Sequence, residues 1–262
     1  MECEGIYYYR IMLNRIRDKE VIFGIRAVIE AIEAGKDIDK VLVKRDLSGE
    51  LFAELMQLLR EYEIPMQKVP VERIDRITRK NHQGVLAFTS AVTYHKLENI
   101  VPLLYEEGKN PFILILDGIT DVRNFGAIAR TCEVAGVNAI VIPERGSVSV
   151  NSDAMKTSAG ALHSLPVCRE RSLKEAIVFL KNSGVKVVAA TEKAATMYTD
   201  AEMNLPVAVV LGSEDIGIEQ EHLRISDELI KLPQFGKIES LNVSVAAGVI
   251  IYEVLRQRRL NS

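Results

Sequence analysis

The chain has 262 residues, of which 48% are hydrophobic, with a formal net charge of −3 and a pI near 5.9. This apolar content excludes wholesale disorder, and the slight acidity excludes a protein that coats nucleic acid through bulk charge, although a local basic patch is compatible with it. No window of 18 uncharged apolar residues predicts a membrane span, and the N-terminus mixes charges into its apolar residues, unlike a secretory signal.

The cysteines and histidines indicate no metal site. Cys3, Cys132 and Cys168 form no CxxC pair, and with the four scattered histidines they make no zinc pattern. We therefore expect a reduced, cytoplasmic, metal-free protein. Residues 1–19 are expected to be a flexible lead-in, and Met12 is a candidate for the true first residue.

Residues 20–93 alternate helix and strand patterns and predict a compact α/β domain. Apolar residues recur at helical spacing from Phe23 to Ile32, and Gly35 stands where a helix C-cap would lie. The next expected elements are a strand at 41–43, an amphipathic helix at 51–59 that ends before Pro65, a helix at 71–78 and a strand at 85–92.

Four basic residues lie close together in the last of these helices and just after it. They are Arg73, Arg76, Arg79 and Lys80. Spacing of three places the arginines on one helix face. Two interpretations stay open, a solvated helix face and contact with RNA phosphates. These four are our candidate RNA-binding residues.

Residues 94–110 are expected to be a linker with one or two helical turns, followed by a second α/β domain over 111–262. Its predicted strands are short and continuously apolar, which is typical of parallel strands covered by helices on both faces. They span residues 111–116, 138–142, 185–190, 206–211 and 228–232. A last helix is expected from 242 to about 258.

Three of these strands are followed by polar segments that contain glycine and lead into helices. The segments are LDGITDVRNFGAIART (116–131), GSEDIGIE (212–219) and PQFGKIESLNVSVAAG (233–248). Because open α/β sheets bind ligands beyond the carboxyl ends of their strands, the three segments predict one shared pocket.

The second segment does not fit a phosphate-binding loop. Gly212 and Gly217 have P-loop spacing, but Ile218 and Glu219 stand where that loop needs Lys and then Ser or Thr. No GxGxxG follows a strand either, which disfavours a dinucleotide. The acidic pair at 214–215 would repel a triphosphate and tolerate a cationic or zwitterionic ligand.

The third segment carries more polar residues than a helix start requires. One N-cap needs one side chain, and here Ser240, Asn242 and Ser244 alternate with apolar residues. The Ala-Ala-Gly stretch that follows lets another backbone approach closely. This pattern suits a helix packed against a ligand or against a twin helix.

The three segments resemble, in order and spacing over 111–258, the signature motifs of the SpoU (TrmH-like) family of RNA ribose 2′-O-methyltransferases. The N-terminal domain, with VIFGIRAVIEAI and NHQGVLAF, is similar to the L30e-like substrate-binding domain of the RlmB-like subgroup, which methylates a guanosine of 23S rRNA. The resemblance implies a SPOUT-type parallel sheet with a deep trefoil knot, S-adenosylmethionine as cofactor, and a homodimer through the C-terminal domain.

The resemblance also assigns site residues. The cofactor contacts it implies are Thr191, Gly212, Leu232 and Leu241. The catalytic and RNA-facing residues it implies are Asn124, Arg130, Glu214, Ser240 and Asn242. Motif one often carries proline after its aspartate, whereas Val122 follows Asp121 here, and this departure predicts a looser loop.

Arg130 allows more than one role. With a helix that starts near Phe125, Arg130 lies in the second turn and can reach back toward Asn124. Without the motif, an ion pair with Asp117 or Glu133 is the simpler interpretation. The family's arginine is proposed to help activate the 2′-hydroxyl. Because an arginine pKa exceeds about 12, we expect Arg130 to bind the adjacent phosphate and stabilise the developing alkoxide.

The other candidates keep alternatives too. Asn124 orients ribose or phosphate, or forms a turn, and Glu214 accepts loop N–H groups or orients Arg130 or Asn242. His163 lies outside the motifs and is expected to be structural or exposed. The rival functions are tRNA 2′-O-methylation, RNA binding or ribosome assembly without catalysis, and a nucleotide-dependent oxidoreductase or kinase, which the missing phosphate motifs disfavour.

Overall fold

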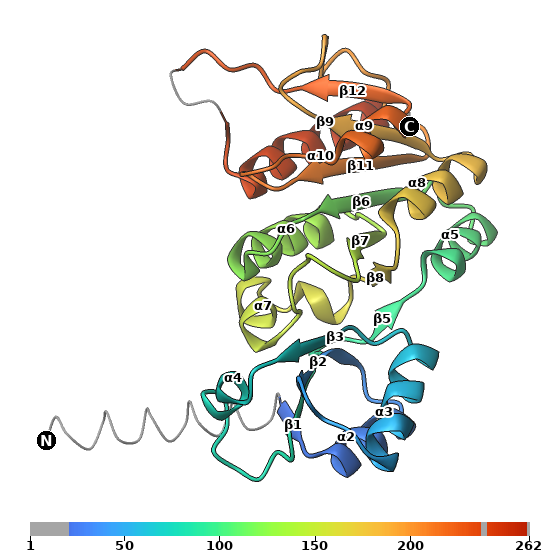
Figure 1. The fold of residues 1–262 in the computed structure, drawn as a ribbon. Helices are drawn as coiled ribbons and strands as arrows, with labels where there is room; N and C mark the ends of the chain where they lie inside the picture. The colour runs from blue at the N-terminus through green and yellow to red at the C-terminus, as the bar shows by residue number, and fades with distance from the viewer. Residues whose placement is uncertain (1–20, 237–239, 261–262) are drawn as a thin grey trace, which may run out of the picture. The chain divides into compact units, whose positions relative to one another are not determined.

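The computed structural model describes residues 21–236 and 240–260 of the chain (Figure 1). Cys3, Met12 and the expected lead-in at 1–19 lie outside the described residues. The chain divides into two compact units, Met1–Ala91 and Val92–Ser262. Among the residues that the structure describes, no helix is long and apolar enough to cross a membrane.

The first unit is a mixed sheet with helices. Its strands are β1 (Val21–Phe23), β2 (Ile38–Lys44), β3 (Met66–Val69) and β4 (Val85–Thr89), in the order β1-β4-β2-β3. The β2–β3 pair is parallel, and β4 is antiparallel to both β1 and β2. The helices are α2 (Ile25–Glu33), α3 (Glu50–Glu61) and α4 (Val71–Asp75). The unit is α/β, as the sequence predicts.

Two details of this unit differ from expectation. Phe23 lies in β1 and not in the following helix, because Gly24 takes a positive φ of 91° and turns the chain into α2. The third helix ends at Asp75, three residues early, and Ile77 and Thr78 then donate to the Ile74 carbonyl in a turn. The expected helix at 71–78 was therefore too long.

The second unit is built on one sheet, in the order β10-β12-β9-β11-β6-β7-β8-β5, and every strand pair in it is parallel. The predicted strands appear as β6 (Phe112–Asp117), β7 (Ala139–Pro143), β9 (Lys186–Ala190), β11 (Val207–Gly212) and β12 (Glu228–Lys231). The unpredicted strands are β5 (Tyr94–His95), β8 (Val167–Glu170) and β10 (Thr196–Met197).

The expected linker at 94–110 belongs to the second unit. β5 pairs with β8, and α5 (Leu97–Glu106) follows it directly. Leu97, Val101 and Leu104 lie one and two turns apart on this helix and are buried in the core of the unit. The segment is therefore part of the core of the second unit, and the linker assignment was wrong.

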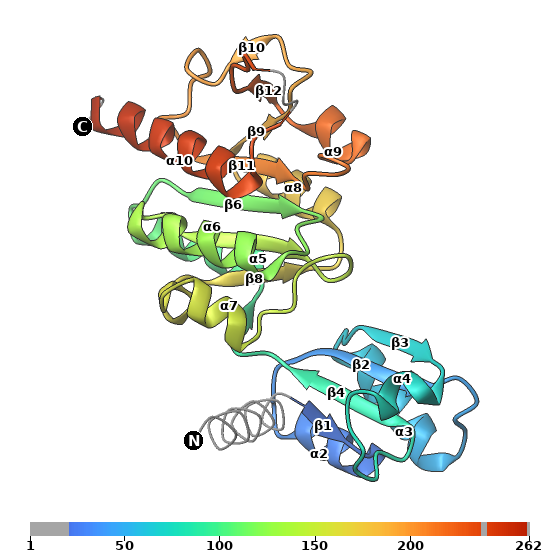
Figure 2. The ribbon, with the colours of Figure 1, turned by 90° about the vertical axis from the view of Figure 1, so that its left-hand side faces the viewer.

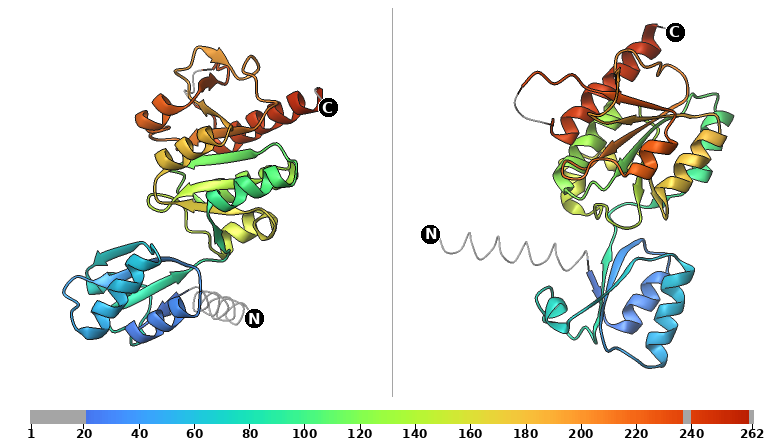
Figure 3. Two further views of the ribbon diagram at one scale, coloured as in Figure 1. Left: turned by 90° about the vertical axis from the view of Figure 1, so that its right-hand side faces the viewer. Right: turned by 45° about the horizontal axis from the view of Figure 1, so that its top comes forward.

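Helices cover both faces of the second sheet. Their bounds are α6 (Val122–Val134), α7 (Ser152–Thr157), the 3₁₀ turn η1 (Ala161–His163), α8 (Leu173–Asn182), α9 (Gln220–Ile225) and α10 (Val243–Leu260). Figure 2 shows α6, α7 and α10 on one side, and Figure 3 (left) shows α5, α8 and α9 on the other. Successive side chains of β6 point to opposite faces of the sheet, so Leu114 belongs to one core cluster and Ile113 to the other.

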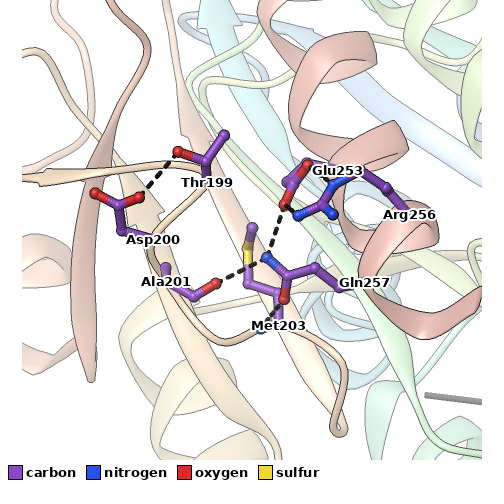
Figure 4. Close-up of polar contacts among 7 residues, drawn as sticks. All are labelled: Thr199, Asp200, Ala201, Met203, Glu253, Arg256 and Gln257. Carbon is purple, nitrogen blue, oxygen red and sulfur yellow. Dashed lines mark hydrogen bonds and ion pairs between the residues drawn. The ribbon is translucent and has the colours of Figure 1, made fainter. Parts of the chain in front are cut away.

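The C-terminal half of α10 is fastened to the segment that follows β10 (Figure 4). The Gln257 side chain accepts from the Met203 backbone N–H at 2.7 Å and donates to the Ala201 carbonyl at 2.9 Å. It also donates to the buried Glu253 carboxylate at 2.8 Å, which Arg256 binds through two further hydrogen bonds. These bonds fix α10, and so fix the direction of its N-terminal end.

The two described cysteines are buried free thiols. Cys132 lies in α6 and Cys168 in β8. Burial raises the pKa of the Cys168 thiol to about 12 and also raises the pKa of Cys132. Both side chains are therefore protonated packing groups.

Candidate active site

A cavity of about 420 Å³ lies at the carboxyl edge of the second sheet, where β9, β11 and β12 end. It brings together six of the residues that the sequence named. They are Thr191, Gly212, Glu214, Leu232, Ser240 and Leu241. The expectation of one shared pocket is met for the second and third polar segments.

Gly212 shapes the wall of this cavity. A Cβ on Gly212 would lie 2.1 Å from the Gly217 carbonyl carbon and 2.3 Å from the Ile218 nitrogen. The Gly217 N–H donates to the Ser213 carbonyl at 2.9 Å, so the loop folds back tightly on the end of β11. Only glycine permits this close approach of two backbone segments.

One carboxylate oxygen connects three segments of the chain beside the cavity. Glu214 Oε1 accepts from Asn242 Nδ2 at 2.7 Å, from the Val243 N–H at 3.1 Å and from Asn124 Nδ2 at 3.2 Å. Asn242 Nδ2 also donates to Asn124 Oδ1 at 3.0 Å. Glu214 therefore orients both asparagines and accepts a backbone N–H, which realises two of its expected roles.

Asn124 lies in a helix and not in a turn. Asp121 caps α6 by accepting from the backbone N–H groups of Arg123 and Asn124 at 2.9 and 2.8 Å. α6 therefore starts at Val122, three residues before the expected start at Phe125. Val122 occupies the first helical position, where proline is favoured but not required, and the looser loop stays a prediction.

Asn242 has two functions at the start of α10. Its Oδ1 accepts from the Ser244 N–H at 3.0 Å and from Ser244 Oγ at 2.5 Å, as an N-cap does. Its Nδ2 makes the contacts to Glu214 and Asn124. Ser240 lines the cavity, so the three polar residues of this segment have separate tasks.

Arg130 is exposed in the third turn of α6, not the second. Among the described residues it forms no ion pair with Asp117 or Glu133, so that interpretation was wrong. Among these residues it also makes no hydrogen bond to Asn124. Its guanidinium is therefore available to an external anion such as a phosphate. His163 is exposed in the turn η1, which agrees with its expected surface location.

Sequence reasoning missed a buried pair behind the second segment. Asp117 Oδ2 accepts from the Glu219 N–H and bonds His222 Nδ1, both at 2.8 Å, and both side chains are buried. The pair fastens the end of β6 to the start of α9 and so holds the loop that carries Glu214. A buried aspartate directly after an apolar strand was the available signal, but its partner lies 105 residues away.

The four candidate RNA-binding residues, Arg73, Arg76, Arg79 and Lys80, are all exposed on the first unit. Only Arg73 lies within α4, so the arginines do not share one continuous helix face. The segment after α4 is tied down instead, because His82 Nε2 bonds the Asp75 carboxylate at 2.9 Å. The described residues contain no group of three or more His, Cys, Asp and Glu side chains that could hold a metal ion.

Comparison with known proteins gives the following matches. Residues 111–252 match the SpoU rRNA methylase family, and residues 21–95 match a family described as RNA 2′-O ribose methyltransferase substrate binding. The chain is 34% identical over 239 residues to Bacillus subtilis YacO, which is assigned to the TrmH family of tRNA/rRNA methyltransferases. That alignment covers 91% of this chain and 96% of YacO.

Two solved structures share the fold. The SpoU methyltransferase AviRb from Streptomyces viridochromogenes, in complex with AdoMet, matches with a TM-score of 0.59 and 22% identity over 92% of this chain and 91% of AviRb. The A. aeolicus TrmH/SpoU tRNA modifying enzyme matches with a TM-score of 0.53 and 26% identity over 63% of this chain and 85% of its own.

Proposed function

The chain belongs to the SpoU rRNA methylase family and is an RNA methyltransferase, and from that premise we propose that it transfers the methyl group of S-adenosylmethionine to a ribose 2′-hydroxyl. We propose a guanosine of 23S rRNA as the acceptor. The observation that carries the proposal is the set of hydrogen bonds by which Glu214 holds Asn124 and Asn242 beside the cavity.

The cavity fits this cofactor. Leu232 and Leu241 offer apolar surface for an adenosine, and backbone close to Gly212 offers polar groups. Three acidic residues, Glu192, Glu214 and Asp215, line it together with one basic residue, Lys193, and this excess of negative charge favours a cationic ligand over an anionic one. Thr191 donates its N–H to the Ile230 carbonyl, which holds that edge of the cavity in place.

When bound, S-adenosylmethionine supplies a methyl group activated by the sulfonium charge. The chain's own residues must align the 2′-oxygen and manage its proton, and alignment alone contributes several kcal/mol. Asn124 and Asn242 are fixed by Glu214, so their amides can hold the ribose or its phosphate without reorganising. Ser240, which lines the same cavity, is a further hydrogen-bonding group for the acceptor nucleotide.

Arg130 is assigned to the phosphate beside the reacting ribose. It is exposed and has no partner among the described side chains. A positioned cation stabilises the alkoxide that develops on the 2′-oxygen. The proton then leaves to a phosphate oxygen or to water.

The first unit is assigned to RNA capture. Its exposed basic residues at positions 73, 76, 79 and 80 provide phosphate contacts, and the match of residues 21–95 to a substrate-binding family supports this role. A truncated protein that lacks residues 1–93 should bind S-adenosylmethionine but should not methylate RNA. Undiminished methylation by that truncation would contradict the assignment.

We propose a homodimer through α10. On α10, Val245, Val249 and Tyr252 are between 37% and 53% exposed and recur every three or four residues, so they form one apolar stripe. Gly248 lies beside this stripe, and a Cβ there would meet no atom within 4 Å. A twin helix from a second copy would cover this face. The deep trefoil knot implied by the family stays a prediction.

The test is methyl transfer from labelled S-adenosylmethionine to unmodified 23S rRNA and, separately, to unmodified tRNA, with the product mapped by nuclease digestion and mass spectrometry. We expect 2′-O-methylguanosine in 23S rRNA alone. Glu214→Ala should lower turnover at least about 100-fold, because both asparagines lose their acceptor. Label in neither RNA would contradict the proposed function.

Methylation of tRNA is the second candidate. It is favoured by the match to a tRNA modifying enzyme over 63% of this chain and by the tRNA/rRNA assignment of YacO. Label in tRNA and not in rRNA would keep the chemistry and would show that the first unit captures tRNA.

A further inference from the structure

A second cavity of about 580 Å³ lies at the same edge of the sheet, beyond the ends of β6, β7 and β8. Its size is within the range of about 300–1,000 Å³ that is usual for ligand pockets. The loop at 213–217 lines both cavities and forms the wall between them. A group bound in the second cavity therefore lies one loop away from the cofactor cavity.

Four charged side chains that line this cavity have no partner among the described residues. Arg145 and Arg171 are positive, and Asp215 and Glu219 are negative. All four are exposed, and none forms an ion pair with another. Opposite charges that face one cavity without pairing leave room for a ligand that carries both an anion and hydrogen-bond donors.

The remaining charges of the cavity are already matched. Asp117 is bonded to His222 at 2.8 Å, and Lys174 is paired with Glu221 at 2.5 Å. The cavity therefore offers two free guanidinium groups and two free carboxylates. The backbone N–H groups at the start of α8, where Ser172 caps only the Glu175 N–H, add donors on the side of the arginines.

We propose that this cavity binds an unpaired nucleotide of the RNA that neighbours the methylated one, an inference that rests on the proposed function. Arg145 and Arg171 bind its phosphate, because guanidinium groups match phosphate oxygens in geometry and charge. Glu219 accepts from the base edge. Guanine fits best because its N1–H and amino group present two adjacent donors to one carboxylate.

The first test measures RNA affinity by fluorescence anisotropy, without cofactor, over a range of salt concentrations. Arg145→Ala and Arg171→Ala should each weaken RNA binding several-fold. Each should also make the negative slope of the logarithm of the binding constant against the logarithm of salt concentration shallower by about 0.7–1. Arg224→Ala is the matched control, because Arg224 is an exposed arginine of α9 that lines neither cavity. Variants that keep the original slope would overturn the proposal.

The second test is a double-mutant cycle on kcat/KM for methyl transfer. Each nucleotide that flanks the mapped target is replaced in turn by an abasic residue, with the unaltered protein and with Glu219→Gln. One abasic position should lower kcat/KM about tenfold in the unaltered protein and have little further effect in Glu219→Gln. If the effects of the abasic residue and of Glu219→Gln on kcat/KM were independent at every flanking position, so that the two losses multiplied, the proposal would be overturned.

The two readouts separate this inference from the proposed function. If the unaltered protein transferred no methyl group but Arg145→Ala still weakened RNA binding relative to Arg224→Ala, the result would support RNA binding in the second cavity and contradict the proposed methyl transfer. If the protein transferred the methyl group and both cavity variants bound RNA as the control does, the result would support the proposed function and contradict RNA binding in the second cavity.

Discussion

The replacement Gly212→Ala is the sharpest test of the cofactor cavity. The added Cβ would lie 2.1 Å from the Gly217 carbonyl carbon and 2.3 Å from the Ile218 nitrogen, whereas ordinary contacts begin near 3.4 Å. Since both neighbours are backbone atoms, the loop at 213–217 must move by more than an ångström. Overpacking of this kind costs about 1–3 kcal/mol, which corresponds to a fall in Tm of roughly 2–12 °C.

The moved loop would no longer line the cavity in its present form, so affinity for S-adenosylmethionine should fall at least about tenfold, or about 1.4 kcal/mol, by isothermal titration calorimetry. Ile177→Val is the control, because Ile177 is fully buried on α8, lines neither cavity and should cost about 0.5–1.5 kcal/mol. Destabilisation alone would affect both variants alike. Unchanged cofactor affinity in Gly212→Ala would refute the reasoning.

Four further predictions concern residues of α6 and α10. Arg130→Lys should lower kcat in the methyl-transfer assay, because lysine keeps the charge but not the bidentate geometry; full turnover would contradict this. Gln257→Ala should destabilise the protein by about 2–4 kcal/mol in urea unfolding, because two buried backbone groups lose their partner. The hydrogen bond from Arg256 lowers the pKa of Glu253 in the folded protein. The stability that the ionised Glu253 contributes is therefore present above about pH 4.5 and is lost as the pH falls through the lowered pKa of the folded state. The difference in unfolding free energy between the unaltered protein and Glu253→Gln should become smaller over the same pH range. Gly248→Ala should weaken self-association in sedimentation equilibrium, although its Cβ meets nothing in a single chain.

The sheet edge could be predicted because its signals are local. The continuous apolar runs of β6 and β11 mark parallel strands, and their polar continuations must then meet at the carboxyl edge. The strands that were missed are short or half polar. β5 and β10 have two residues each, and β8 ends in Arg169-Glu170, so none shows a periodicity of its own.

The start of α6 in motif one was predicted wrongly, although the sequence contains the signal for the correct start. Asp121 is a strong N-cap residue, and its cap to the Arg123 and Asn124 N–H groups starts α6 at Val122. Three residues of difference move Arg130 from the second turn to the third. The linker at 94–110 failed for another reason, since its apolar spacing was visible but the surface that buries it was not.

The polar residues at the site were ambiguous in sequence because each had a sufficient local role, and the structure shows that local and long-range roles coexist. Asn242 uses its Oδ1 to cap α10 and its Nδ2 to reach Glu214, 28 residues away, and Asn124, 118 residues away. An asparagine can do both because its amide carries an acceptor oxygen and a donor nitrogen on separate atoms, whereas the carboxylate of an aspartate only accepts. The residue type, not the capping pattern, therefore carries the functional information at this position.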